Sequence, residues 1–85
     1  MKIIVAGLPD IKTRRTLMTV EEVVAKSRHI IQVEWISDVH EMGKLGVKHL
    51  PTVIVNQDVR VESRIPSMYE VQTWIEEELA ETIAA

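Results

Sequence analysis

The first half of the chain alternates between short β-branched runs and a segment in which apolar residues recur at helical spacing. Residues 2–6 are rich in β-branched side chains and are closed by Gly7, as is typical of a buried strand. Over residues 11–27 the pattern predicts an amphipathic helix with Asp10 as its N-cap. Residues 30–36 alternate between apolar and polar, which predicts a second strand, parallel to the first. The predicted buried face of the helix holds Leu17, Met18, Val20, Val23 and Val24.

The middle of the chain predicts a short helix and a hairpin. Asp38 is a candidate N-cap for a helix over residues 39–45, and Gly46 is the expected stop of that helix. Two β-branched runs, 53–55 and 59–61, follow, with three turn-forming residues between them. This pattern indicates a tight antiparallel hairpin.

A closing helix is predicted from Ser67 to about Glu81. Ser67 and Glu70 match the capping-box pattern, in which each side chain bonds the backbone N–H of the other residue. We expect the acidic run 76–78 to lie in water. Together the elements predict an α/β fold of order β-α-β-α-β-β-α, with a mixed four-stranded sheet, helices on its faces and a single domain over residues 1–85.

Three sequence motifs follow one another along this predicted order of elements. They are K-I-I-V-A-G at residues 2–7, L-P-T-V-I-V-N at residues 50–56 and R-I-P-S-M-Y-E-V at residues 64–71. In order and spacing they resemble the thioredoxin fold, and in particular the small glutaredoxin-sized thioredoxin-like proteins of prokaryotes. The resemblance implies a thioredoxin-like fold in which Pro51 stands at the place of the family's cis-proline.

The redox motif of that family is absent from this chain. In the family a C-x-x-C begins the first helix, whereas the corresponding positions here are Asp10 and Thr13, within D-I-K-T, and the chain has 0 cysteines. Thiol–disulfide exchange needs a thiolate nucleophile and a second sulfur, and a carboxylate and a hydroxyl supply neither. The family's redox activity therefore does not carry over, and we expect no catalytic residue.

The composition and the N-terminal sequence limit the kinds of partner and the cellular compartment that we expect. The formal net charge of -3 and a pI near 5.5 argue against nucleic-acid and anionic-membrane partners. The N-terminal apolar run is too short for a signal-peptide core or a membrane span, so we expect a cytoplasmic protein. His29, His40 and His49 do not fall at metal-ligand spacing, and we expect no metal site and no cofactor.

The candidate site is the surface where residues 8–15 meet residues 49–52. In the family this face binds extended peptides or thiol substrates, and the residue before the cis-proline pairs its backbone with the bound strand. Leu50 takes that place here, which favours a redox-inactive module that binds a protein or peptide partner. The candidate binding residues are Leu8, Asp10, Lys12, Thr13, Arg14, His49, Leu50, Pro51 and Thr52.

Alternatives remain open at this point. The basic start of the first helix, with Lys12, Arg14 and Arg15, could hold a small anion or a glutathione-type ligand, either as a binder or as a cysteine-independent enzyme. The acidic cap Asp10 argues against that use of the helix. A regulatory role resembling the clock-associated thioredoxin-fold proteins is a further alternative. A partly exposed Trp74 would mark a self-association face and a homodimer.

Overall fold

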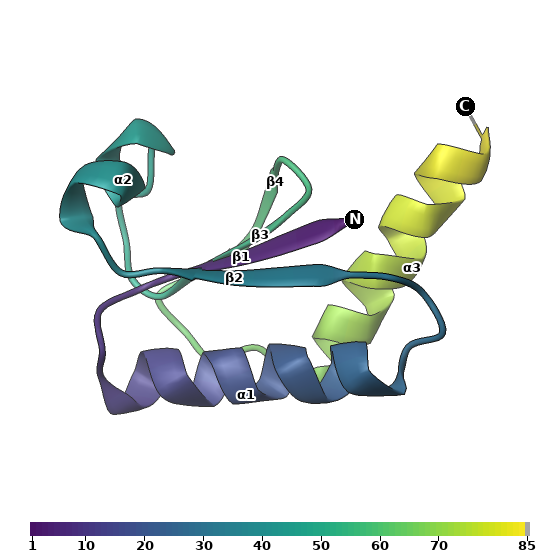
Figure 1. The fold of residues 1–85 in the computed structure, drawn as a ribbon, viewed down its shortest axis with the longest axis horizontal. Coiled ribbons are helices and arrows are strands. Elements are labelled where there is room, and N and C mark those ends of the chain that lie inside the picture. Colours follow the sequence, from purple (N-terminus) through teal and green to yellow (C-terminus); the bar gives the residue numbers. More distant parts are fainter. Residues whose placement is uncertain (85) are drawn as a thin grey trace.

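The computed structural model describes residues 1–84, with side chains up to Glu81, as one mixed sheet carrying three helices (Figure 1). The strands are β1 (Lys2–Ala6), β2 (Gln32–Ile36), β3 (Thr52–Val55) and β4 (Asp58–Glu62), in the order β2-β1-β3-β4 across the sheet. The helices are α1 (Ile11–Lys26), α2 (Val39–Lys44) and α3 (Met68–Ala84). The β1 and β2 strands are parallel, whereas β3 is antiparallel to both β1 and β4. The order β-α-β-α-β-β-α and the thioredoxin-like fold class predicted from the sequence are confirmed.

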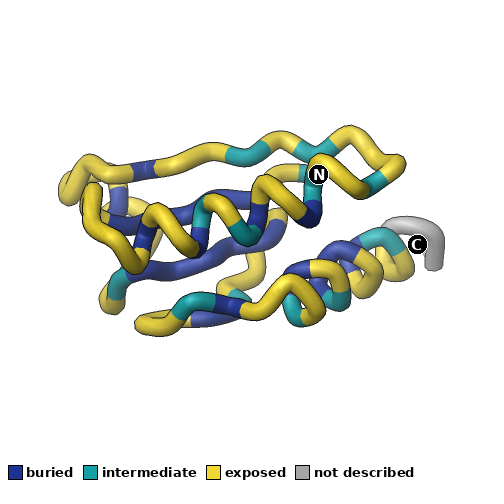
Figure 2. The backbone as a smooth tube through the Cα atoms, turned by 90° about the horizontal axis from the view of Figure 1, so that it is seen from below, coloured by how far each residue is buried: buried dark blue, intermediate teal, exposed yellow. Residues whose placement is uncertain are grey.

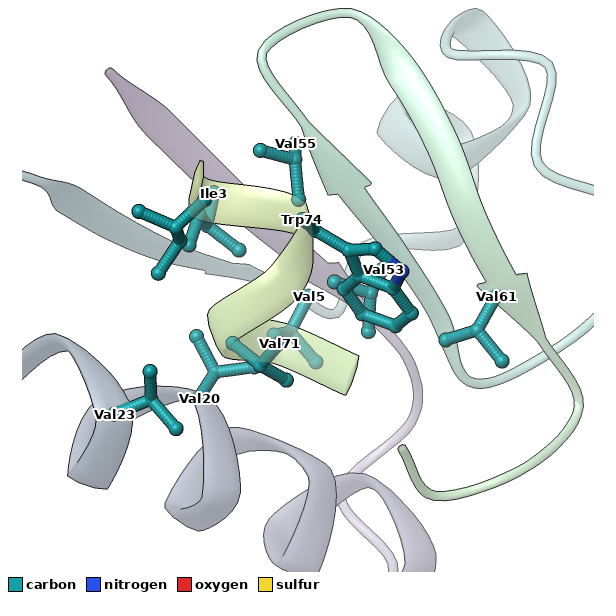
Figure 3. Packing of buried hydrophobic residues seen from close by; sticks show 10 residues of the cluster. Ile3, Val5, Val20, Val23, Val53, Val55, Val61, Val71 and Trp74 are labelled. Atoms are coloured by element: carbon teal, nitrogen blue, oxygen red, sulfur yellow. The ribbon is translucent and has the colours of Figure 1, made fainter. Parts of the chain in front are cut away.

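The two faces of the sheet carry separate apolar cores. Alternating residues of β1 divide between them, because successive side chains of a strand point to opposite faces. Ile3 and Val5 pack with α1 and α3, where Val20 and Val71 are fully buried (Figure 3). Each such side chain stabilises the fold by about 1.5–3 kcal/mol. The opposite core is smaller and lies beneath α2. It consists of Ile4, Ala6, Ile36, Met42 and Ile54.

The N-caps predicted from the sequence are all formed. A carboxylate oxygen of Asp10 accepts the backbone N–H of Thr13 at 2.8 Å. At α2, Asp38 accepts two backbone N–H groups of the first turn, at 2.8 and 3.1 Å. At α3, Ser67 and Glu70 form the reciprocal pair, with distances of 3.0 and 3.1 Å. These caps satisfy donors that have no partner within their helices, so they define where each helix begins.

The turn of the hairpin and the second strand are shorter than predicted, whereas the two strands of the hairpin are longer. The turn between β3 and β4 has two residues rather than three, because Val55 already pairs with Asp58. Asn56 makes this turn with a left-handed φ of 57°, a conformation that asparagine tolerates better than most residues. The β2 strand begins at Gln32, not at residue 30.

The helix ends also differ slightly from the prediction. The α1 helix ends at Lys26 with Ser27 as its C-cap, and α2 ends at Lys44. Gly46 has a φ of 75°, as expected for the residue that stops a helix. The α3 helix continues to Ala84 instead of stopping at about Glu81.

Two side chains, Met18 and Glu78, do not lie where the sequence predicts. Met18 is 67% exposed, because α1 turns Thr13 and Thr16 toward the sheet instead. Thr16 can be buried since its hydroxyl donates to the backbone carbonyl of Lys12 at 2.8 Å. Glu78 lies in the buried stripe of α3 and is only 3% exposed, so the expectation that the whole acidic run lies in water is wrong.

Trp74 does not have the partly exposed position that the self-association alternative requires. Its side chain is 9% exposed and packs in the core beside Val61 and Val53 (Figure 3). A buried indole offers little surface to another molecule. Trp74 is therefore a core residue and not the centre of a self-association face.

Candidate functional site

The two stretches of the candidate site meet at one end of the sheet. Ala6, the last residue of β1, lies opposite Thr52, the first residue of β3. The chain enters the β1–α1 loop directly after Ala6, where the N–H of Gly7 bonds the carbonyl of Ile36 at 3.0 Å. Leu8 and Leu50 each lie two residues beyond the pair formed by Ala6 and Thr52. The register of the sheet therefore places both stretches at the same edge.

The Leu50–Pro51 peptide bond is cis, and its two residues differ in exposure. Pro51 is buried and its carbonyl accepts the N–H of Ser63 at 2.8 Å. The carbonyl of His49 accepts the hydroxyl of Thr52 at 2.5 Å. Leu50 is half-buried, and within residues 1–84 neither its N–H nor its carbonyl has a hydrogen-bond partner. The residue before the proline thus presents a free donor and a free acceptor.

The two residues at the positions of the missing cysteines have structural roles. Asp10 is exposed, and the backbone N–H of Thr13 that its carboxylate accepts lowers the pKa of Asp10 below its ordinary value. The carboxylate is therefore ionised at neutral pH. Thr13 is 1% exposed, so no substrate can reach its hydroxyl without a change in structure. Neither side chain is placed for nucleophilic catalysis.

The basic residues of the first turn do not converge on one point. The ammonium of Lys12 lies 3.4 Å from the backbone carbonyl of Ser63, to which it donates. Arg14 is exposed, and its guanidinium has no ion pair or hydrogen bond in the described part of the chain. The ionised carboxylate of Asp10 occupies the N-terminal end of α1, where an anion would otherwise bind. This arrangement does not favour the anion-binding alternative.

His49 is exposed at the margin of the site. The candidate site holds both a carboxylate, Asp10, and an imidazole, His49, the side-chain types that act together in acid–base catalysis. No hydrogen bond or ion pair joins these two side chains within the described residues. The structure therefore gives no support to acid–base chemistry between them.

Sequence reasoning missed two residues of this surface. Ser63 connects its parts, because its N–H bonds the carbonyl of Pro51 and its carbonyl accepts the ammonium of Lys12. Its φ of 66° is unusual for serine, and no glycine or asparagine in the sequence marked the turn. Ile11, at the start of α1, is 70% exposed, and with Leu8 at 43% it forms an apolar margin beside the loop. An apolar residue directly after an N-cap is the signal that could have identified Ile11.

One carboxylate cluster lies at the opposite end of the sheet. Oxygen atoms of Asp58, Glu78 and Glu81 all lie within 4.8 Å of one another, the one such group among the residues described. Burial is the main reason that the pKa of Glu78 is raised, and hydrogen bonds with Glu81 and Asp58 raise it further. The Arg60 guanidinium, 3.8 Å from a carboxylate oxygen of Glu78, offsets part of the repulsion between these carboxylates.

No helix in the described part of the chain has both the length and the apolar character needed to span a bilayer.

The sequence was compared with protein families, with curated proteins and with solved structures. A family model described as a thioredoxin domain matches residues 1–76, which include every strand and the first half of α3. No curated protein and no solved structure matches the chain. The match agrees with the strand order and with the position of Pro51.

Proposed function

Because the chain belongs to the thioredoxin-domain family, we propose that it is a redox-inactive member that binds an extended segment of a protein partner at the surface around Leu50. The lack of cysteine removes dithiol chemistry, whereas the backbone of this surface does not depend on sulfur. Binding through the backbone requires only an accessible N–H and carbonyl at the end of a sheet.

The observation that carries the proposal is the free peptide group of Leu50. A half-buried N–H and carbonyl without partners cost free energy unless water or another chain satisfies them. In a bound extended peptide, a backbone carbonyl would accept a hydrogen bond from the N–H of Leu50, and a backbone N–H would donate to the carbonyl of Leu50. Pro51 and Thr52, on the C-terminal side, are held by hydrogen bonds to Ser63 and His49.

The apolar margin formed by Leu8 and Ile11 supports a peptide ligand over a small anion. The start of α1 and the loop before it, which carry these side chains, follow the end of β1, at the same end of the sheet as the free peptide group, and would supply apolar surface to a bound strand. Their exposed area would be removed from water on binding, at about 25 cal/mol per Å². A peptide with alternating apolar residues fits both the backbone groups and this margin.

An amide NMR titration tests the proposal. The nitrogen-labelled chain is titrated with an unfolded, carboxymethylated protein as an extended probe, and with the folded form of the same protein as a control. We expect shifts or broadening at Leu8, Leu50 and Thr52 with the unfolded probe alone. Perturbations confined to other surfaces, or none with the unfolded probe at high concentration, would refute binding at this face.

A further inference from the structure

The β2 strand is an edge of the sheet, and its outer backbone groups have no partner among the residues that the structure describes. The N–H of Gln32 bonds Met1 and the carbonyl of Ile36 accepts from Gly7, both at 3.0 Å, so even-numbered residues of β2 direct their backbone groups toward β1. Val33 and Trp35 consequently direct their N–H and carbonyl groups outward. In Figure 2, β2 runs along the upper margin of the molecule, largely exposed, and no other described helix or strand lies outside it.

The two edges of the sheet differ in their protection. The β4 edge is interrupted by a register shift opposite Val53 and Ile54 and carries Arg60, which reaches across to Glu77 at 3.2 Å. Bulges and charged side chains are the features that keep edge strands from pairing. The β2 strand pairs with β1 in unbroken register, and the one carboxylate it carries, Glu34, is neutralised by Lys2 of the same chain at 2.6 Å.

If β2 of a second copy lies antiparallel to β2 with Val33 opposite Val33, the residues on one side of Val33 meet suitable partners on the other side. Ile30 would face Ile36 of a second copy, Ile31 would face Trp35, and Gln32 would face Glu34. Ile30 is 92% exposed, an extent that the fold of one copy does not explain.

We propose that β2 pairs antiparallel with β2 of a second copy of this chain, centred on Val33, to form a homodimer with one continuous sheet. The hydrogen-bonding pattern fits this register. Val33 and Trp35 direct their backbone groups outward, and Ile31 would do the same once pairing extends β2 by one residue, so the pairs Val33 with Val33 and Ile31 with Trp35 exchange hydrogen bonds. Gln32 and Glu34 form the intervening pair without backbone hydrogen bonds, in which side chains lie closest.

Neighbouring registers are disfavoured by the same side chains. A pairing centred on Glu34 would place two carboxylates of like charge opposite each other and Ile30 opposite Asp38. A pairing centred on Gln32 would place Ile30 opposite Glu34. Like charges directly opposite destabilise a sheet, and neither register gives the most exposed isoleucine an apolar partner. The inference does not depend on the proposed function, because it uses a different edge of the sheet.

Cysteine cross-linking tests the register without interference, because the chain has no thiol of its own. Gln32→Cys and Glu34→Cys are made as separate variants, both at exposed positions. Opposed residues of this pair type have Cβ atoms about 4.5–5.5 Å apart, near the separation of a disulfide. We expect the mixture of the two variants to cross-link under mild oxidation much faster than either variant alone. Faster cross-linking of either variant with itself would overturn the Val33-centred register.

Sedimentation equilibrium tests the dimer itself. We expect the wild-type chain to be dimeric and Ile30→Lys to weaken self-association by about tenfold or more, since the pair with Ile36 occurs twice in the symmetric dimer. Val59→Lys is the matched control, because Val59 is 52% exposed on β4. Val33→Pro should also dissociate the dimer, since it removes an outward N–H and no bond to β1. A monomeric wild type at all concentrations, or equal weakening by Val59→Lys, would overturn the proposal.

Discussion

Gly7 lies so close to Thr13 that a methyl group on its Cα would overlap Thr13 Oγ1 and lie 2.9 Å from Thr13 Cγ2. The contact joins the end of β1 to the first turn of α1. It fixes how the loop that carries Leu8 and Asp10 leaves the sheet. The close packing of these two residues is therefore a condition for the geometry of the candidate site.

Gly7→Ala should destabilise the protein through this contact. We expect a loss of about 1–3 kcal/mol in the free energy of unfolding, the usual cost of overpacking a buried position. Thr13→Ala in the same chain should recover part of the loss. Urea denaturation measures both. Gly43→Ala is the control, because nothing lies within 4 Å of its added methyl group, and it should stabilise α2 by about 0.5–1 kcal/mol.

The cap of α3 predicts a specific dependence of stability on pH. The Arg64 guanidinium donates two hydrogen bonds to the carboxylate of Glu70, with N–O distances of 2.9 and 2.5 Å. Together with the backbone N–H of Ser67, these bonds lower the pKa of Glu70 from 4.5 to about 2. A lowered pKa stabilises the fold above the unfolded value, and this contribution is lost as the pH falls through the folded value. Glu70→Gln should therefore be less stable than wild type at pH 7, and the difference should shrink as the pH falls from about 4.5 toward about 2.

Thermal unfolding over this pH range measures the effect. Ser67→Ala, which removes the other half of the cap, should cost about 1 kcal/mol at every pH. Glu21→Gln is a control on the exposed side of α1. A constant difference between Glu70→Gln and wild type at all pH values would contradict the role assigned to the charge of Glu70.

The buried carboxylate of Glu78 should make stability depend on pH in the direction opposite to that of Glu70. Asp58 and Glu81 lie beside it, and the Arg60 guanidinium faces it at 3.8 Å. Because the pKa of Glu78 is raised in the folded state, its favourable contribution is complete below the unfolded pKa and is lost as the pH rises through the folded pKa. Glu78→Gln should be more stable than wild type at pH 7, and the gain should disappear in acid.

Chemical denaturation at several pH values measures this gain. Glu77→Gln is the matched control, because Glu77 is the neighbouring carboxylate and is paired with Arg60 at the surface. It should change stability by less than about 1 kcal/mol. If Glu78→Gln is less stable than wild type at neutral pH, the assignment of a raised pKa to Glu78 in the folded state is wrong.

Ile11 offers a test of the proposed binding face with an internal control on the same helix. Ile11→Asp should weaken binding of the unfolded, carboxymethylated probe by about tenfold, because it places a charge where apolar side chains would pack. Met18→Asp should leave binding unchanged. Met18 is 67% exposed, close to the 70% of Ile11, and lies on the same side of α1 about 10 Å further along its axis. Isothermal titration compares the two, and equal losses would exclude a specific role for Ile11.

The fold could be predicted largely because local signals agree with one another. Strand runs, the caps Asp10, Asp38 and Ser67 and the stop at Gly46 each define a boundary without reference to the rest of the chain. Boundaries that depend on partners were less accurate. The β2 strand begins at Gln32, where β1 can pair with it. The residue types at positions 30 and 31 do not indicate that the strand starts only after them.

Side-chain burial was harder to predict because it depends on tertiary contacts. Hydrophobicity favoured Met18 over Thr16 for the sheet-facing side of α1, but Thr16 satisfies its hydroxyl within the helix and can be buried. Glu78 lies on the same stripe as Val71 and Ile75, so its periodicity was visible. Its burial depends on Arg60 and Asp58 of the hairpin, which only the fold brings close.

The candidate site was predicted in part for the same reason. The meeting of residues 8–15 and 49–52 follows from the strand order, which the sequence supports. Ser63 was missed because its role uses only backbone atoms and a left-handed φ of 66° that its residue type does not indicate.

The strand order also has a consequence for synthesis on the ribosome. The first strand made, β1, is central, and its antiparallel neighbour β3 ends only at Val55. The apolar face that β1 and β3 share is then covered by Val71, Trp74 and Ile75 of the last helix. The nascent chain therefore cannot bury its larger core until residues 71–75 of the last helix have left the exit tunnel, so this core should form only after both strands of the hairpin have been made.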